Sequence, residues 1–324
     1  MSVTDQIPES TPFSPLPQRR PASANGDSPS GQGLPQRSPG AAADNSSLSL
    51  PRRASGGRSR RVGRHRSLHR ISVASDAPAL VLAVPGWGNA TANLASSIAE
   101  STIASCPGVD IRIGYLNGST DTLADALAAN AEPRSPDVPH AVVVPLLAGP
   151  HPVLDAAIAA AISAAKAPVM LATALGPHPL LAGALHDRLH QVGLARASRA
   201  RGLNIAAGAT GIIVVADRGP QAIADVGVTT VLLAARLATP AAQASLGDPA
   251  SIDAAVGRLR ETGANHLALS PCVVGPETDP AEFAALSGAL GAPCAPPLGA
   301  HPAIAQLVAV RYGEALTRIT VASH

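Results

Sequence analysis

A histidine directly after a buried strand is the first residue of this sequence that could do chemistry. Residues 141–151, AVVVPLLAGPH, begin as a continuous apolar run and end at His151. Such a run is typical of a strand buried on both faces of a parallel sheet. Open α/β sheets bind ligands just beyond the carboxyl ends of their strands. The position of His151 therefore predicts a ligand-binding or catalytic imidazole.

A second stretch repeats this arrangement with a carboxylate in place of the imidazole. Residues 266–277, HLALSPCVVGPE, form another apolar run, which ends in Gly-Pro followed by Glu277. An imidazole suits Fe, Co and Ni ions, but a single one binds them weakly and needs a partner. If the two strand ends line one cleft, Glu277 is the best partner for His151. The alternative is that Glu277 is a solvated loop residue.

A second kind of repeated histidine lies in an L-G-x-H-P turn. His178 stands in LGPHP and His301 in LGAHP, each before an apolar helical pattern. One interpretation is a structural turn, in which the ring bonds a backbone group at the helix end. The other is that both rings contact carboxylates of a substrate. His186 and His190, four residues apart on one predicted helix, could clamp a metal, but without a third ligand nearby we expect them to be surface residues.

The elements that would position these residues alternate between strand and helix. We expect strands over 79–84, 109–115, 141–146, 167–173, 211–216, 241–246 and 266–271, with helices over 90–105, 119–130 (capped by Ser119), 151–165, 177–192, 250–262 and after 301. Residues 227–236 have strand propensity, but the repeat places them in a helix, and we follow the repeat. The alternation predicts an α/β protein with parallel sheets built from right-handed βαβ units.

Matched stretches in the same order suggest that this α/β part is duplicated. We expect two similar doubly wound, parallel-sheet halves at residues 77–195 and 205–324. Residues 1–76 are rich in Pro, Ser, Gly and Arg and show no apolar periodicity. Such a segment buries too little surface to offset its ordering entropy, which predicts a disordered tail.

The tail also carries a net positive charge, whereas the rest of the chain is net negative. Eight arginines lie within residues 51–70, although the whole chain has a net charge of only +2. Such a run could bind nucleic acid or anionic lipid by neutralising phosphates; the alternative is an ordinary solvated tail. Outside this tail nothing suggests nucleic-acid binding.

Composition excludes several other classes. The three cysteines, Cys106, Cys272 and Cys294, are isolated, which favours structural thiols in a reducing compartment, and hence the cytoplasm. No apolar run is long enough to span a membrane, and the N-terminus lacks the apolar region of a secretory signal. Neither GxGxxG nor GxxxxGK[ST] occurs, so we expect no nucleotide cofactor.

The strand ending PLLAGPH, the LGPHPLL turn and the terminal PLGAHPAIAQLVAVRY together resemble the CbiX-type sirohydrochlorin chelatases, some of which are tandem duplications. The resemblance covers about residues 78–312. It implies insertion of a divalent metal substrate, Co²⁺ or Fe²⁺, into sirohydrochlorin or a related tetrapyrrole, as in cobalamin or sirohaem biosynthesis. It also implies that histidines after the first and third strands bind the metal and accept the pyrrole protons. His151 matches the second of these positions, and His151 with Glu277 resembles the His and Glu pair of protoporphyrin ferrochelatases.

The first of these positions holds Pro85, where the family usually has histidine. Proline can neither bind a metal nor accept a proton, so a second interpretation stays open: a catalytically degenerate chelatase homologue that binds metal, tetrapyrrole or a partner protein. Trp87, in the same loop, could stack on a macrocycle or simply pack in its loop. Arg218, in the matching loop of the second half, could pair with a substrate carboxylate.

Overall fold

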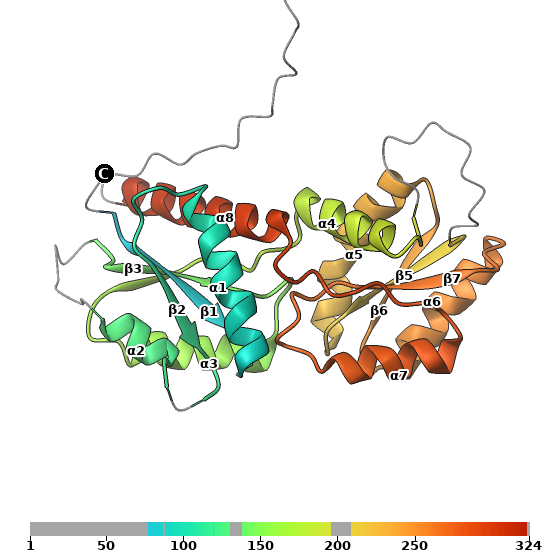
Figure 1. The fold of residues 1–324 in the computed structure, drawn as a ribbon, viewed down its shortest axis with the longest axis horizontal. Helices are drawn as coiled ribbons and strands as arrows, with labels where there is room; N and C mark the ends of the chain where they lie inside the picture. Colours follow the sequence, from blue (N-terminus) through green and yellow to red (C-terminus); the bar gives the residue numbers. More distant parts are fainter. Residues whose placement is uncertain (1–76, 87, 119, 130–137, 196–208, 323–324) are drawn as a thin grey trace, which may run out of the picture. The chain divides into compact units, whose positions relative to one another are not determined.

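The first sheet of the computed structural model holds four parallel strands in the order β2-β1-β3-β4. The structure describes residues 77–322 apart from 87, 119, 130–137 and 196–208 (Figure 1). The predicted tail at 1–76, with its basic run, therefore lies outside the described residues. The strands are β1 (Ala79–Val84), β2 (Ile111–Tyr115), β3 (Ala141–Pro145) and β4 (Val169–Leu171).

A second parallel sheet holds three strands in the order β6-β5-β7. Its strands are β5 (Gly211–Ala216), β6 (Ala241–Ser245) and β7 (Leu267–Pro271). The helices between the strands are α1 (Asn89–Ile103), α2 (Leu123–Ala128), α3 (Pro152–Ser163), α4 (Pro179–Gln191), α5 (Pro220–Leu237), α6 (Pro249–Glu261), α7 (Pro280–Leu290) and α8 (Pro302–Ala322). The predicted α/β class with two parallel sheets is confirmed. Residues 227–236 lie inside α5, as the repeat predicted.

The central strands are apolar throughout because both faces of each sheet are covered. Every residue of β1, β3 and β5 is buried. Alternate residues of β1 and β3 contribute to two different core clusters, as expected from the two-residue period of a strand. In Figure 1, α1 and α8 lie on one face of the first sheet and α2 and α3 on the other.

The last helix before β5 and the last helix of the chain each pack on the sheet of the other predicted half. Helix α4 contacts α5 and β7 of the second sheet, whereas α8 contacts α1 and β3 of the first sheet (Figure 1). Tyr312 of α8 donates a hydrogen bond of 2.6 Å from its hydroxyl to the Pro78 carbonyl, just before β1. The helices thus cross the boundary between the two predicted halves, and the halves as separate domains remain a prediction.

Proline begins most of the helices that follow a strand. The first helical residue is proline in α3, α4, α5, α6, α7 and α8. Proline suits this position because its ring fixes a helical φ and the missing N–H would have no partner in the helix. The preceding residue is then the N-cap, and in α3 and α4 that residue is a histidine. Within the described residues, no helix is long and apolar enough to cross a membrane.

Candidate active site

His151 is held at the end of β3 by the first turn of α3. Its ring Nδ1 accepts a hydrogen bond of 3.3 Å from the Leu154 backbone N–H, and the backbone N–H of His151 donates to Asp155 Oδ2 at 2.9 Å. An imidazole that accepts through Nδ1 carries the proton of its neutral form on Nε2. Only 18% of the side chain is exposed. The ring is therefore oriented by the helix, with Nε2 as its remaining polar atom.

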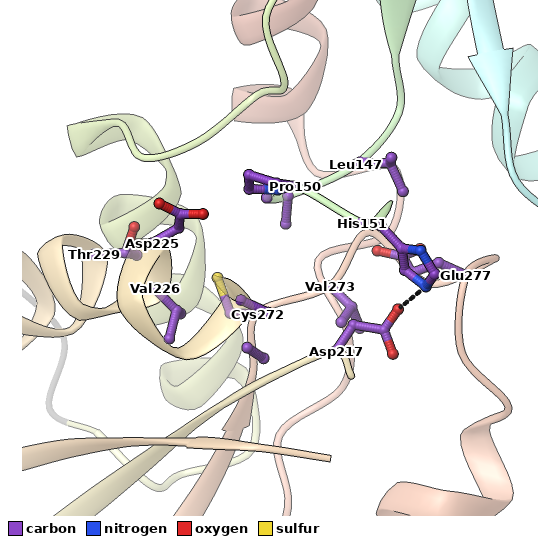
Figure 2. A pocket seen from close by; sticks show the side chains of 14 residues that line it. Leu147, Pro150, His151, Asp217, Asp225, Val226, Thr229, Cys272, Val273 and Glu277 are labelled. Carbon is purple, nitrogen blue, oxygen red and sulfur yellow. Dashed lines mark ion pairs between the residues drawn. The ribbon is translucent and has the colours of Figure 1, made fainter. Parts of the chain in front are cut away.

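The neighbour of Nε2 is Asp217, which directly follows β5. Its Oδ2 lies 3.1 Å from His151 Nε2, and 13% of the side chain is exposed (Figure 2). Although this distance is that of an ion pair, Oδ2 is buried and makes no well-aligned hydrogen bond with any described residue. Sequence reasoning missed Asp217. The available signal was its register, since Asp217 follows the six-residue strand β5 as Pro85 follows the six-residue strand β1.

Glu277 lies in the loop after β7, and its carboxylate is turned back onto that loop. Oε1 accepts the Val274 backbone N–H at 2.6 Å, and Oε2 accepts the Gly275 N–H at 2.7 Å. Burial, opposed by backbone hydrogen bonds and assisted by the nearby charge of Asp217, raises the pKa of Glu277 to about 7. Near neutral pH this carboxyl group is therefore divided between its acid and base forms.

These three residues line one pocket, together with apolar side chains and a few other polar groups. Figure 2 shows His151, Asp217 and Glu277 at one end in this view and Asp225 and Thr229 at the other. The lining consists of Leu147, Ala148, Gly149, Pro150, His151, Ala216, Asp217, Ala222, Asp225, Val226, Thr229, Cys272, Val273 and Glu277. The cavity measures about 30 Å³, which is room for roughly one water molecule.

The metal-binding capacity of the described residues is limited. Among them, no group of three or more His, Cys, Asp and Glu side chains is placed to hold a metal ion. Burial, with a smaller contribution from the charge of Glu277, raises the pKa of the Cys272 thiol in the pocket to about 12. The thiolate form that binds metals is therefore disfavoured. The predicted pair of His151 and Glu277 shares the pocket, and Asp217 is the residue in contact with the imidazole.

The described residues among the other predicted site residues, Arg218, His178 and His301, are not part of this pocket lining. Arg218 follows Asp217, but it forms an exposed ion pair with Glu282 of α7. Trp87 lies outside the described residues. Its neighbour Gly86 lies close to the Pro276 carbonyl, because a Cβ added to this glycine would be 2.7 Å from that oxygen. The loop that carries Pro85 and the loop that carries Glu277 are therefore in direct contact.

Both L-G-x-H-P histidines bond the first turn of the helix that follows. His178 Nδ1 accepts the Leu180 N–H at 3.1 Å, and His301 Nδ1 accepts the Ala303 N–H at 3.2 Å. Burial, followed by a nearby arginine, lowers the pKa of both rings. The structural turn is therefore present in both copies, and contact with a substrate remains a prediction.

An arginine on each of these helices secures the turn before the other helix. Arg188 of α4 donates to the Leu298 carbonyl through Nε at 3.0 Å, and Arg311 of α8 donates to the Leu175 carbonyl through a terminal nitrogen at 2.9 Å. Of the two histidines on α4 that we expected at the surface, His190 is exposed, but His186 is buried and its Nδ1 accepts a hydrogen bond of 2.9 Å from Arg236 of α5. Arg188 and His186 of α4 therefore make hydrogen bonds that connect elements of the fold, and the His186 nitrogen that bonds Arg236 is not available to a metal.

The fold and the pocket define an α/β protein with two parallel sheets and acid–base side chains at its strand ends. Two solved structures share this fold: the sirohydrochlorin chelatase SirB from Bacillus subtilis subspecies spizizenii in complex with cobalt, and SirB from Bacillus subtilis with Fe³⁺. The TM-scores are 0.51 and 0.50 at 15% identity; the matches cover 74% and 73% of this chain and 96% and 95% of those chains. No protein-family model and no curated protein sequence matches the chain. The likeness therefore establishes a chelatase-like fold.

Proposed function

We propose that this protein inserts a divalent metal ion, Co²⁺ or Fe²⁺, into sirohydrochlorin or a related tetrapyrrole. The observation that carries the proposal is the meeting of His151 and Glu277 in one strand-end pocket, within a fold shared with two SirB structures. In the reaction, the metal ion sheds water and bonds the four ring nitrogens while two N–H protons leave. A site for this reaction needs a ligand for the incoming ion and acceptors for both protons.

His151 and Glu277 fit the parts of ligand and proton acceptor. Either role of His151 uses the Nε2 lone pair, so the ring proton has to move to Nδ1 and the bond to the Leu154 amide is lost. A cap of this kind is worth about 1 kcal/mol, so the cost is small. Glu277, with a pKa of about 7, can take a proton from the macrocycle and return it to water near neutral pH.

The size of the cavity determines where the macrocycle binds. A space of about 30 Å³ admits an ion or a water molecule, and a tetrapyrrole is many times larger. We therefore place the ion inside the pocket and the macrocycle across its mouth. Sirohydrochlorin carries eight carboxylates, and Arg218, Trp87, His178 and His301 remain our proposed contacts to them or to the ring plane.

Pro85 favours a second candidate, in which the protein binds a metal ion, a tetrapyrrole or a partner protein without catalysis. The family places a metal-binding and proton-accepting histidine here, and proline can do neither. The described residues also lack a group of three metal-ligating side chains. This candidate predicts stable binding of the macrocycle with no metal insertion.

Purified protein mixed with sirohydrochlorin and Co²⁺ or Fe²⁺ separates the two candidates. The absorbance of the macrocycle reports insertion, and we expect His151→Ala to lower the rate at least about 100-fold, the scale of one general acid–base group. His266→Ala is the control, because His266 is an exposed histidine outside the pocket lining. Insertion no faster than without protein would overturn the enzyme proposal. Equal rates in His151→Ala and wild type would remove His151 from the mechanism.

A further inference from the structure

The contact between His151 and Asp217 has an unusual combination of properties for a simple ion pair. The two atoms are 3.1 Å apart, yet Oδ2 of Asp217 is buried without a well-aligned hydrogen bond from a described residue. A buried polar group without a hydrogen bond destabilises the fold, and a charged one does so more. The negative charge on this Asp217 oxygen is therefore only partly compensated by the described protein atoms.

The separation of the two atoms matches that of neighbouring ligands on one metal ion. Metal–nitrogen and metal–oxygen bonds of about 2.1 Å place adjacent ligands about 3.0 Å apart in octahedral geometry and about 3.4 Å apart in tetrahedral geometry. A cation placed next to both His151 Nε2 and Asp217 Oδ2 would contact the two atoms and neutralise the Asp217 carboxylate. A cavity that holds about one water molecule is large enough for that ion.

A comparable pair elsewhere in the protein lacks these properties. His301 Nε2 lies 3.5 Å from Asp187 Oδ2, but the Asp187 side chain is 52% exposed and can be hydrated. Neither residue is part of the pocket lining. The same two residue types therefore form an ordinary surface contact in the pair of His301 and Asp187. In the pair of His151 and Asp217 they enclose an anionic oxygen at a strand end.

We propose that Asp217 and His151 form a two-ligand transit site for a divalent cation, with Asp217 taking the place of the ligand that Pro85 cannot supply. The macrocycle nitrogens at the mouth of the pocket then complete the coordination of the ion. A site with only two protein ligands binds weakly, which suits an ion that has to leave for the macrocycle. The inference rests on the proposed function only for this last transfer, because binding of the cation requires no tetrapyrrole.

Cobalt binding to the full-length protein tests this site without a substrate. Protein stripped with a chelator is titrated with Co²⁺ at fixed pH, followed by calorimetry and by the visible absorption of bound Co²⁺. We expect Asp217→Asn and His151→Ala each to weaken binding about tenfold or more, the loss typical of a metal-site partner. Asp187→Asn, from the surface pair, should bind as wild type does.

Asp225→Asn distinguishes direct ligation from the general negative charge of the pocket. Asp225 lines the same pocket from α5, so a purely electrostatic effect would weaken binding in this variant as much as in Asp217→Asn. Equal losses in the two variants would overturn the assignment of Asp217 as a ligand, as would wild-type affinity in Asp217→Asn.

If Asp217→Asn fails to fold, the variant Asp217→Cys tests the same ligand through a new absorption band. In Asp217→Cys a ligating sulfur should add a thiolate-to-cobalt absorption band in the near ultraviolet that the wild-type protein lacks. A folded Asp217→Cys protein that binds Co²⁺ without this band would contradict the inference. Cobalt binding through Asp217 without metal insertion would uphold the site and overturn the enzyme proposal; insertion with unchanged cobalt affinity in Asp217→Asn would do the reverse.

Discussion

The loops after β1 and β3 in the first sheet and those after β5 and β7 in the second occupy matching positions, but they carry different chemistry. Pro85 follows β1 where Asp217 follows β5, and the Gly-Pro turn after β3 ends in His151 where that after β7 ends in Glu277. By contrast, the two L-G-x-H-P turns retain the same ring-to-backbone bond and the same arginine contact. The shared parts maintain the scaffold, and the differing parts concentrate the carboxylates on the second sheet.

Placing a histidine at position 85 should produce the largest change. In Pro85→His the first sheet gains a metal ligand and a proton acceptor beside the loop of Glu277. We expect the rate of cobalt insertion into sirohydrochlorin to rise on the order of 100-fold, as general acid–base groups typically contribute. The absorbance of the macrocycle, followed over time, measures the rate. Pro85→Ala is the control. A rate in Pro85→His no higher than in Pro85→Ala would show that the site does not use this position.

A substitution in the contact between the Pro85 loop and the Glu277 loop should have the next largest effect, on the stability of the protein. In Gly86→Ala the new Cβ would lie 2.7 Å from the Pro276 carbonyl oxygen, and the residue has a φ of +79°. We expect the free energy of unfolding to fall by about 2–4 kcal/mol from overpacking and backbone strain. Gly88→Ala is the control, since its φ is also positive but no atom lies within 4 Å of the added Cβ. Denaturant unfolding should show the smaller loss in the control, and equal losses would exclude the interloop contact as the cause.

Glu277 should make the free energy of unfolding depend on pH. The pKa of Glu277 is raised to about 7 in the folded protein from an ordinary value of 4.5. The folded state therefore binds this proton more tightly, and its contribution to stability is lost as the pH rises from about 4.5 to 7. Each pKa unit corresponds to about 1.4 kcal/mol, so the loss is on the order of 2–3 kcal/mol.

Denaturant unfolding at pH 5 and pH 7.5 measures this difference. Glu277→Gln should show a smaller loss of stability between the two values than wild type does. Glu282→Gln, which removes the exposed partner of Arg218, should retain the wild-type pH dependence. A Glu277→Gln curve parallel to that of wild type would contradict the prediction.

The two arginine contacts should give the smallest effect, and the two losses should be equal. Arg188→Ala and Arg311→Ala each remove charged donors to a backbone carbonyl, which are worth about 1.5–3 kcal/mol where buried and less here because water replaces part of the bond. We expect each variant to lose about 1–2 kcal/mol of unfolding free energy. Thermal and denaturant unfolding of both variants check this equality. A loss confined to one of them would show that the matching turns contribute unequally.

Much of the fold was readable from the sequence because buried parallel strands leave a strong pattern. The strands predicted at 79–84 and 211–216 coincide with β1 and β5, and the strand predicted at 141–146 exceeds β3 by one residue. The repeat correctly overruled the strand propensity of residues 227–236, where packing on the second sheet favours helix. Helix ends were less predictable: α2 is capped by Thr122, whose side chain and that of Asp125 bond each other's backbone, and not by Ser119.

The candidate site was only partly predictable. His151 and Glu277 stand out because each ends an apolar run in a Gly-Pro turn, and both line the pocket. Asp217 lies in an Asp-Arg-Gly sequence typical of an exposed loop; its register after β5 marks a strand end, but its tertiary contact with His151 is needed to reveal its role. His186 was misjudged for a similar reason, because α4 packs against α5 and buries a ring that its own helix would expose. Local patterns locate strand ends, but long-range packing decides which side chains meet there.

The return of α8 to the first sheet has a consequence for synthesis of the chain on the ribosome. The Tyr312 hydroxyl bonds the Pro78 carbonyl across 234 positions of sequence, and the part of the first sheet that α8 covers stays exposed until α8 has been translated. Contacts this distant slow folding because a long loop must close before they form. The earliest strands to emerge are therefore among the last to be enclosed, and the nascent protein has to keep an apolar sheet from aggregating in the meantime.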